Sequence, residues 1–512
     1  MDVPEGFGKG TYRRSGQRMS ESLLVLDIGT TSVKVACFDS KGLLLGSASE
    51  TYPTLHPHPD WAEQDPHEYW VATIKAVQSL PKRDDIVAIG LSAHMNGALI
   101  VDATGEPLYP HIIHSDVRST KQCQLLEEIW GRAQIYHKTS NPIAAHLSLP
   151  KLLWLKENHP SLFHRTAWVL NGKDWIRFKL TGKIGTTDFS DASLTGLFNS
   201  GQKRWDEEMA SSLGIPLSML PEAHASTAIA GVLSPEAARL LGLQQGIPVS
   251  YGGGDAACAT RGALVTTSGE AYAAIGSSAW VSMLSKEPIP DGRMRMQHFF
   301  DLEGERVNVC GTVQSAGIAT DWALGLLSQG QSREELERQA ADVRPGSSNV
   351  LFLPYLMGER TPHWDPCARG AYIGLSPSTD AATLLRATYE GVAFALGECV
   401  SIYEELGLPL KKFTLLGGAM RGTLLAAIIT NVLGHSVHMH RWPTQATALG
   451  AAFAAAVGVG LYKTIEEAIA DVVMQDTILT PDEEMVASYK VYFEHYRCLY
   501  PALQQIFQLQ NR

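Results

Sequence analysis

Two similar hairpin signals, roughly half a chain apart, constrain the fold of this sequence more than any other feature. Near the N-terminus, an apolar strand beginning at Leu23 runs into the turn Ile28-Gly29-Thr30-Thr31 and then into a second strand. Near the middle, the strand from Glu270 runs into Ile275-Gly276-Ser277-Ser278 and again into a second strand. A repeat at this separation predicts two duplicated domains that face each other across a cleft, with a boundary near residues 266–270.

Segments of strand character alternate with segments of helical spacing along both halves, which predicts a mixed α/β architecture. The two domains are expected to span residues 22–268 and 269–512. Residues 1–21 are expected to form a flexible N-terminal extension, because they contain no apolar run. Helical spacing covers residues 66–80, 120–130, 150–157, 380–406, 424–433 and 446–459.

Composition excludes several classes of protein. With 512 residues, 45% hydrophobic and 19% charged, the chain has the make-up of a globular protein of two or more domains. A formal net charge of -11 and the lack of a long basic run argue against binding to nucleic acid or to an anionic membrane. The seven cysteines have neither CxxC nor Cys/His spacing, and no apolar stretch is long enough to span a membrane. We therefore expect a cytoplasmic protein without a zinc site or a disulfide framework.

The first hairpin has the features of a phosphate-binding turn. Backbone N–H groups in a turn without side-chain bulk hold phosphate well, and the hydroxyl groups after Gly29 add donors. Asp27 would lie at the strand end beside the phosphates, where a carboxylate is useful if Mg²⁺ accompanies a nucleotide. A plain β-turn is the alternative interpretation, and the chain has neither a P-loop nor a GxGxxG signature.

Two glycine-rich segments that follow strands give further candidates. The run Gly252-Gly253-Gly254 presents Asp255 at the mouth of a strand, where a general base for a substrate hydroxyl is needed. The alternative is that Asp255 is only the N-cap of a helix over residues 256–264. The turn at residues 415–422 would let an adenine or ribose lie against the backbone, or it is simply a tight connection between a strand and a helix.

Three loops of the first half combine aromatic, amide and charged side chains, as sugar sites do. The loops are Trp61 to Pro66, Ala93 to Gly97 and His114 to Arg118. Polar groups fix the orientation of a small ligand and an apolar ring stacks on it, and these loops contain both. Each loop could equally be a solvated turn. A metal site is not indicated, because the histidines lack HxH or HExxH spacing.

Several longer segments occur together and in a fixed order, and in that order they closely resemble the FGGY family of carbohydrate kinases. Within that family the chain is most similar to the xylulokinase branch, and the likeness covers about residues 22–500. The segments are LDIGTTS from Leu26, WAEQDP from Trp61, NGKDWIRFKLTGKIGTTDFSDAS from Asn171, GGGD from Gly252, GERTPHWDP from Gly358, RATYEGVAFAL from Arg386, LGGAMRG from Leu416 and ATALGAAFAAAVGVG from Ala446.

The resemblance implies an actin-like ATPase fold, related to ribonuclease H, in which two duplicated domains enclose a central cleft. It implies ATP and Mg²⁺ as cofactors, sugar binding and the catalytic base in the first domain, and nucleotide binding in the second. Matched to the family motifs, Asp255 is the catalytic base and Asp27 holds Mg²⁺ through water. The matched ATP-binding residues are Gly29, Thr30, Thr31, Gly276, Ser277, Ser278, Gly311, Gly417 and Gly418. The matched sugar-binding residues are Trp61, His94, Met95, Asn96, Asp116, Arg118 and Ala256.

The expected reaction is phosphorylation of the terminal hydroxyl of a ketopentose, with D-xylulose as the first choice and D-xylulose 5-phosphate as its product. The chain departs from the xylulokinase pattern at Asn96, where a histidine is usual, and at Ala256, where an asparagine is usual. Gluconate, ribulose, L-xylulose or another polyol are therefore alternatives. A non-catalytic sugar sensor and an ATPase acting on proteins are further alternatives. The expected partners are the sugar and ATP, and a homodimer is compatible with this reading.

Overall fold

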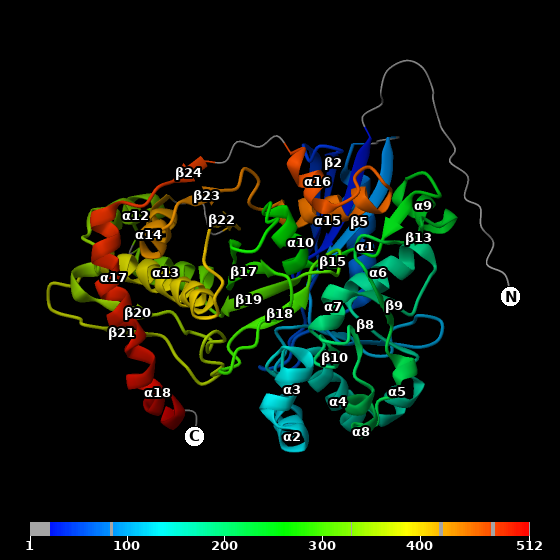
Figure 1. Cartoon of the computed structure of the whole chain (residues 1–512), viewed down its shortest axis with the longest axis horizontal. Coiled ribbons are helices and arrows are strands. Elements are labelled where there is room, and N and C mark those ends of the chain that lie inside the picture. Colours follow the sequence, from blue (N-terminus) through cyan, green and yellow to red (C-terminus); the bar gives the residue numbers. More distant parts are fainter. Residues whose placement is uncertain (1–20, 82–84, 329, 419–422, 473–476, 511–512) are drawn as a thin grey trace, which may run out of the picture.

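The computed structural model describes residues 21–81, 85–328, 330–418, 423–472 and 477–510 (Figure 1). The predicted N-terminal extension lies outside these residues except for Glu21, and so do residues 419–422 of the glycine-rich turn. Two α/β halves lie side by side, each built on its own sheet (Figure 1). Within the described ranges, no helix combines the length and the apolar character that crossing a membrane requires.

The first sheet has the strand order β13-β14-β5-β1-β2-β3, and β15 also pairs with β5. The sequence SLLVLDI of β1 is buried throughout, because β1 lies in the interior of the sheet with both faces covered. β1 runs antiparallel to β2 and parallel to β5. The strands are β1 (Ser22–Ile28), β2 (Ser32–Asp39), β3 (Leu44–Thr51), β5 (Ile86–Ala93), β13 (Ile229–Val232), β14 (Pro248–Ser250) and β15 (Gly253–Gly254).

The second sheet repeats this arrangement, with the order β18-β19-β17-β16-β22-β23-β24. In each sheet an antiparallel hairpin, β1–β2 or β16–β17, is followed on its inner side by parallel strands. The duplication predicted from the two turn sequences is therefore seen in the topology. The strands are β16 (Glu270–Ile275), β17 (Ala279–Ser285), β18 (Gln297–Phe300), β19 (Val307–Val313), β22 (Lys412–Leu416), β23 (Val437–Met439) and β24 (Thr477–Leu479).

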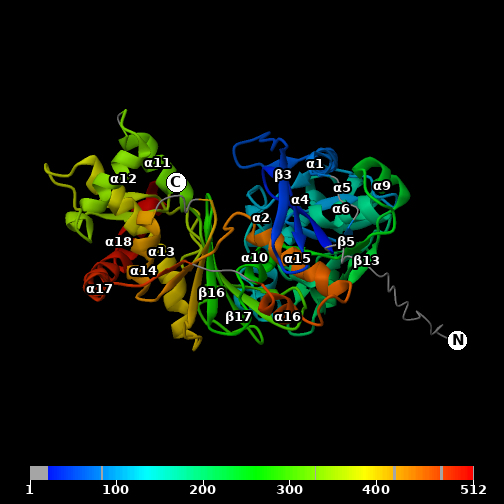
Figure 2. The ribbon, with the colours of Figure 1, turned by 90° about the horizontal axis from the view of Figure 1, so that it is seen from above.

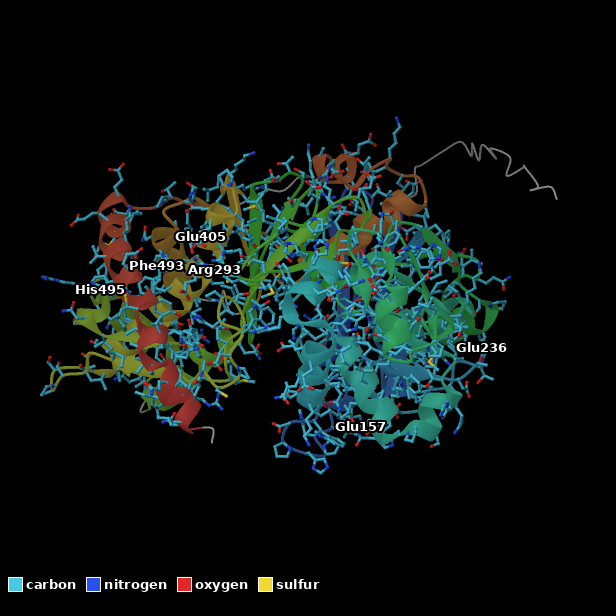
Figure 3. All side chains as sticks on the ribbon, turned by 60° about the horizontal axis from the view of Figure 1, so that its bottom comes forward. Glu157, Glu236, Arg293, Glu405, Phe493 and His495 are labelled. Carbon is cyan, nitrogen blue, oxygen red and sulfur yellow. The ribbon has the colours of Figure 1, made fainter. Side chains whose placement is uncertain are left out.

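Ion pairs connect two segments of the second half. Arg293 and Glu405 lie near each other there (Figure 3), and Glu405 also pairs with Arg295 at 2.6 Å. Arg295 in turn pairs with Asp291 at 3.0 Å, so the segment leading into β18 is tied to the end of α13 (Ala381–Glu405). α13 begins at the N-cap Asp380 and supplies much of the core of this half.

One helix of the second half of the sequence packs on the first sheet. α15 (Ala446–Gly458) contacts β1 and β5 and lies beside α10 (Asp255–Gly262), as the view from above shows (Figure 2). Its alanine-rich sequence allows this close approach, because small side chains leave room for the backbone of a neighbour. The domain boundary at residue 268 therefore stays a prediction, because α15 lies beyond it in the sequence and packs on the first sheet.

The remaining elements cover the faces of the two sheets or extend the first half. The helices are α1 (Pro66–Ser79), α2 (Thr120–Trp130), α3 (Arg132–Thr139), α4 (Ser148–Asn158), α5 (Pro160–Arg165), α6 (Gly172–Thr181), α7 (Phe189–Ser193), α8 (Glu207–Ser212), α9 (Pro235–Leu241), α11 (Gly317–Leu327), α12 (Arg333–Asp342), α14 (Thr423–Leu433), α16 (Ile465–Ala470), α17 (Glu483–Arg497) and α18 (Leu499–Gln510). The short strands are β4 (Glu63–Gln64), β6 (Leu99–Val101), β7 (His111–Ile112), β8 (Trp168–Leu170), β9 (Thr186–Asp188), β10 (Phe198–Asn199), β11 (Arg204–Trp205), β12 (Glu222–His224), β20 (Leu351–Leu353) and β21 (Ala371–Ile373), with 3-10 turns at Leu217–Met219 and Ser347–Asn349.

The crossing of α10 and α15 depends on glycine, which gives the first prediction. A methyl group added at Gly450 would overlap the carbonyl oxygen of Cys258 in α10. Gly450→Ala is therefore expected to destabilise the protein by about 1–3 kcal/mol, the usual effect of overpacking, and to lower Tm. Gly325→Ala in α11 is the control, because open space surrounds Gly325 and alanine favours a helix. Equal melting temperatures for the two variants would contradict this account.

Candidate active site

Strand register brings the two predicted catalytic carboxylates together. Asp27 of β1 is the register partner of Ser92 in β5, and Gly253 of β15 is the partner of Ser92 on its other side. Asp255 follows two residues later as the first residue of α10. Ligands of open α/β sheets bind at the carboxyl ends of parallel strands, and this is where both carboxylates lie.

Asp255 has the electrostatic character of a general base. Burial raises its pKa to about 7, and the nearby negative charge of Asp27 contributes to the rise. Burial also raises the pKa of Asp27, while Lys34 and the Ser92 hydroxyl oppose that rise. A carboxyl with a pKa near neutrality can accept and release a proton at ordinary pH.

The N-cap interpretation of Asp255 is wrong. The helix begins at Asp255 itself and is preceded by Gly254, which has extended backbone angles and gives no side-chain cap. The Asp255 carboxylate accepts a hydrogen bond at 2.8 Å from the N–H of Ala256, and not from the later N–H groups that an N-cap residue binds. The carboxylate is therefore available for chemistry.

In each predicted phosphate hairpin the glycine N–H closes the turn, and the first turn is one residue longer than the second. The N–H of Gly29 donates to the carbonyl of Ser32 at 3.0 Å, and the N–H of Gly276 donates to the carbonyl of Ser278 at 2.9 Å. Gly276 and Ser277 are exposed at the tip of the second turn, so their backbone groups are open to a ligand. Both sequences thus form tight turns between antiparallel strands, and phosphate binding by them stays a prediction.

The structure places the predicted nucleoside-lining glycines in different surroundings. Gly417 has a φ of 107° and packs against the backbone of Ile275, directly before the second hairpin, where a side chain would not fit. Open space surrounds Gly418. Gly311 lies inside β19, and Cys399 of α13 occupies the space over its α-carbon. Packing alone thus explains a glycine at position 311, and its contact with the nucleoside stays a prediction.

The predicted sugar loop lies directly against the segment that carries the base. A side chain added at Gly254 would overlap the thioether of Met95, so the two segments are in close contact. Asn96 adopts a φ of 69°, a left-handed conformation that asparagine tolerates. Several polar side-chain atoms of these loops are buried and have no hydrogen-bond partner among the described residues. They are Oδ1 of Asn96, both ring nitrogens of His94 and Nδ1 of His114. A bound sugar would supply the missing bonds, and sugar binding by these atoms stays a prediction.

The histidines of this loop cluster are neutral at ordinary pH. Burial lowers the pKa of His94 to about 4 and that of His114 to about 3. The ring of His94 stacks on that of His111, with centroids 5.3 Å apart, and lies 5.7 Å from that of His114. A neutral imidazole can both donate and accept a hydrogen bond, which suits the hydroxyl groups of a sugar.

Side chains of the second half reach the same cluster. The Nε2 atom of Gln297 lies 2.9 Å from Nε2 of His146, and the ring of Trp364 stacks on His146 with centroids 6.0 Å apart. Arg360 contributes to the low pKa of both His114 and His146, so its charge is nearby. The two halves therefore meet around the predicted sugar site.

Trp61, Asp116 and Arg118 form a support for this site. Each side-chain nitrogen of Arg118 already donates to a neighbour, Nε and Nη2 to Asp116 and Nη1 to Glu63. The guanidinium group lies 3.7 Å above the ring of Trp61, and Asp116 accepts a further bond from the N–H of Ala62. These contacts fix one predicted sugar loop to another. Direct contact of the three side chains with sugar stays a prediction.

A hydrogen-bond chain that was not predicted from the sequence links the sugar loops to the first hairpin. Nδ1 of His111 lies 2.9 Å from the Tyr69 hydroxyl, which donates to Gln64 at 2.6 Å. The Gln64 amide donates to the carbonyl of Thr30 at 2.6 Å. Gln64 belongs to the WAEQDP segment, so that motif was the available signal, but its partner at Thr30 is set by the fold.

Comparison with known proteins identifies the family of the chain. The sequence models of the FGGY family of carbohydrate kinases match over residues 22–262 for the N-terminal domain and 271–459 for the C-terminal domain. A xylulose kinase of Staphylococcus epidermidis is 32% identical over 95% of this chain and 98% of its own length. A glycerol kinase of Thermus brockianus is 34% identical over 86% of this chain and 90% of its own length.

Solved structures match the fold of the whole chain. The crystal structure of a ligand-bound xylulose kinase from Lactobacillus acidophilus superposes with a TM-score of 0.88 at 26% identity, covering 94% of this chain and 98% of that one. The chain therefore belongs to the FGGY family of carbohydrate kinases, and it has the actin-like ATPase fold of two related domains.

The raised pKa of Asp255 predicts a stability that depends on pH. Asp255 has a pKa of about 7 in the folded state and a pKa near 4 in the unfolded state, so its ionisation destabilises the fold. The destabilisation is absent below about pH 4, grows as the pH rises and is complete above about pH 7. Asp255→Asn is expected to raise Tm at pH 8, by an amount that shrinks toward zero at pH 4. Asp102→Asn is the control, because hydrogen bonds from Thr104 lower the pKa of Asp102 and its loss should lower Tm at pH 8. Thermal melts from pH 4 to 8 measure both, and a lower Tm of Asp255→Asn at pH 8 would contradict the assignment.

Proposed function

We propose that this carbohydrate kinase transfers the γ-phosphoryl group of ATP to the terminal hydroxyl of D-xylulose, giving D-xylulose 5-phosphate. The observation that carries the proposal is the contact between the Asp255 segment and the loop of His94, Met95 and Asn96. The contact supports a site in which the Asp255 carboxyl, with a pKa of about 7, acts on a sugar bound to the unpaired polar groups of that loop. A polyol bound to those groups would present a hydroxyl to the base.

In the proposed mechanism Asp255 accepts the proton of the sugar hydroxyl as that oxygen attacks. His94, Asn96 and His114 hold the sugar through its other hydroxyl groups, so that the attacking oxygen faces Asp255. The two hairpin tips offer backbone N–H groups to the phosphates. Phosphoryl transfer depends mainly on positioning and charge stabilisation, and this arrangement supplies the positioning.

The residues present fit ATP with Mg²⁺. Mg²⁺ keeps several waters and is usually held by one or two carboxylates together with substrate phosphates. Asp27 is such a carboxylate, and within the described part of the chain no set of three metal-binding side chains forms a closed metal site. Asp27 would hold Mg²⁺ through water. When bound, ATP supplies the phosphoryl group and Mg²⁺ neutralises part of its charge.

The chemistry of the sugar site favours a neutral polyol. His94 and His114 are uncharged and offer hydrogen bonds, but they do not neutralise a carboxylate. The similarity to xylulose kinases over almost the whole chain supports D-xylulose among the polyols. A role as a sugar sensor without catalysis is disfavoured, because Asp255 and both hairpins are in place. We expect the enzyme to act in the cytoplasm, and a homodimer stays a prediction.

A substrate screen tests the proposal. ADP release is measured with D-xylulose, L-xylulose, ribulose, glycerol and gluconate, each at several concentrations and with a no-sugar control. Gluconate is the acidic member and is included because Arg360 lies near His114. The proposal predicts strictly sugar-dependent ADP release with the highest kcat/KM for D-xylulose. A higher kcat/KM for another sugar would show that this sugar, and not D-xylulose, is the substrate. ADP release at the same rate without sugar would refute the proposed kinase activity.

Loss of the base gives a kinetic prediction. Asp255→Asn keeps the size of the side chain but cannot accept the proton, so kcat should fall by about 10² or more while ATP affinity changes little. In the wild type, kcat should rise with pH up to about pH 7 and level off above it, because the base must be ionised. Initial rates across pH and nucleotide titrations measure both. Near-normal turnover of Asp255→Asn would remove Asp255 from the mechanism.

The two departures from the xylulokinase pattern give a specificity prediction. Asn96 and Ala256 lie on the two segments that meet at the Met95–Gly254 contact, so changes at both should act on one ligand. Asn96→His together with Ala256→Asn is expected to raise kcat/KM for D-xylulose relative to the other polyols by about 5- to 150-fold, the effect of satisfying one buried polar group. Each single variant should do less. An unchanged or lower preference in the double variant would show that other contacts select the sugar.

A further inference from the structure

The residue immediately before the base is held by a side chain from a distant segment. The N–H of Gly254 donates to the hydroxyl oxygen of Ser190 at 2.9 Å, and this bond is buried. Ser190 lies on α7, and β15, which contains Gly254, packs beside that helix. Because Gly254 immediately precedes Asp255, the Ser190 hydroxyl fixes the start of the helix that carries the base.

Asp188 determines which way the Ser190 hydroxyl points. The Asp188 carboxylate accepts bonds from the Ser190 hydroxyl, from the Ser190 N–H at 2.9 Å and from the Ser226 hydroxyl at 2.8 Å. The Ser190 hydroxyl has a single proton, and its hydrogen bond to Asp188 uses that proton. A lone pair of the Ser190 oxygen is thereby left for the N–H of Gly254.

A buried lysine lies among three carboxyl groups of this cluster. Nζ of Lys173 lies 3.0 Å from Asp174, 2.9 Å from Asp188 and 3.3 Å from Asp191, and all four side chains are almost completely buried. Burial alone would lower the pKa of Lys173, but the three carboxylates raise it, so the lysine stays charged. A buried cluster of this kind is rarely the most stable way to fill a core, which favours a role in positioning.

The same cluster also reaches the sugar loop. The Asn171 side-chain oxygen accepts a bond from the N–H of Gly97 at 3.2 Å, and the N–H of Asn171 donates to Asp174 at 3.2 Å. Lys173 connects Asp174 to Asp188. One buried network therefore contacts both the sugar loop, at Gly97, and the base segment, at Gly254.

We propose that Ser190, oriented by Asp188, is a positioning residue for Asp255. Its hydroxyl keeps the first turn of α10 at a fixed place relative to the sugar loop, so that the carboxylate meets the acceptor hydroxyl. This inference rests on the proposed function, in which Asp255 is the base. It assigns to the buried cluster a part in turnover rather than in the binding of either substrate.

The test compares two buried serines on the same helix. Ser190→Ala removes the bond to Gly254, whereas Ser193→Ala removes a bond from the N–H of Phe300, which lies in the second sheet. Ser190→Ala is expected to lower kcat about tenfold, with KM for ATP and for D-xylulose changed by less than about threefold. The pH at which kcat reaches half of its plateau should move below pH 7, because a displaced carboxyl is better solvated.

The control variants should keep most of the activity. Ser193→Ala should keep kcat within about twofold, and Ser190→Thr, which retains the hydroxyl, should recover much of the rate.

A second measurement does not depend on activity. The pH-dependent gain in Tm caused by Asp255→Asn is measured in the wild type and again in the Ser190→Ala background. The proposal predicts a smaller gain in that background, because the carboxyl is no longer held in its buried place. Equal gains in both backgrounds, or equal kcat values for the two serine variants, would overturn it. If the wild type phosphorylates no sugar, the proposed function fails, and the paired melts still decide whether Ser190 positions Asp255.

Discussion

The placement of two carboxylates at one end of the first sheet is the constraint on which the rest of the site depends. The pairing of β1 and β15 with β5 brings Asp27 near Asp255. Burial raises the pKa of Asp255, and the negative charge of Asp27 raises it further. Burial of two like charges opposes folding, so other parts of the structure must hold them in place. The strand pairing, the glycine-mediated contact of α10 with α15 and the Ser190 bond all serve this purpose.

The site is connected in two directions by hydrogen bonds. Toward the first hairpin, His111, Tyr69 and Gln64 lead to the carbonyl of Thr30. Toward the base, Asn171 and the cluster around Lys173 lead from the sugar loop to Gly254. The structure thus joins the proposed sugar, phosphate and base positions through buried polar contacts rather than through flexible loops. A kinase that must align three groups before transfer gains from such preorganisation.

Features that depend on neighbouring residues could be predicted from the sequence. The two hairpins and the helix Thr120–Trp130 follow from local hydrophobic patterns, and the structure confirms them. The repeated turn predicts the duplication, and the three glycines before Asp255 at the end of a strand mark it as a candidate base. The family motifs add the residues that match sugar, phosphate and base positions of the FGGY kinases.

Features set by distant partners could not be predicted. Asp116 bonds to Ala62, 54 residues away, and Gly254 bonds to Ser190, 64 residues away, and no local pattern specifies either pairing. The return of α15 to the first sheet is likewise a matter of packing between helices. The buried charges at Lys173 and Asp174 were visible in the sequence, but a charged pair on a helix is usually solvent-exposed, and only the fold shows that this one is buried.

The most direct test of the central claim is ³¹P NMR of the reaction mixture. The claim is that the Asp255 carboxylate directs phosphoryl transfer to a hydroxyl of a sugar bound at the adjoining loop of His94, Met95 and Asn96. With ATP, Mg²⁺ and D-xylulose, the account predicts one new phosphomonoester signal, coupled to the two protons of the terminal carbon, and no more inorganic phosphate than without sugar. Inorganic phosphate as the main product, formed at the same rate with and without sugar, would contradict the account.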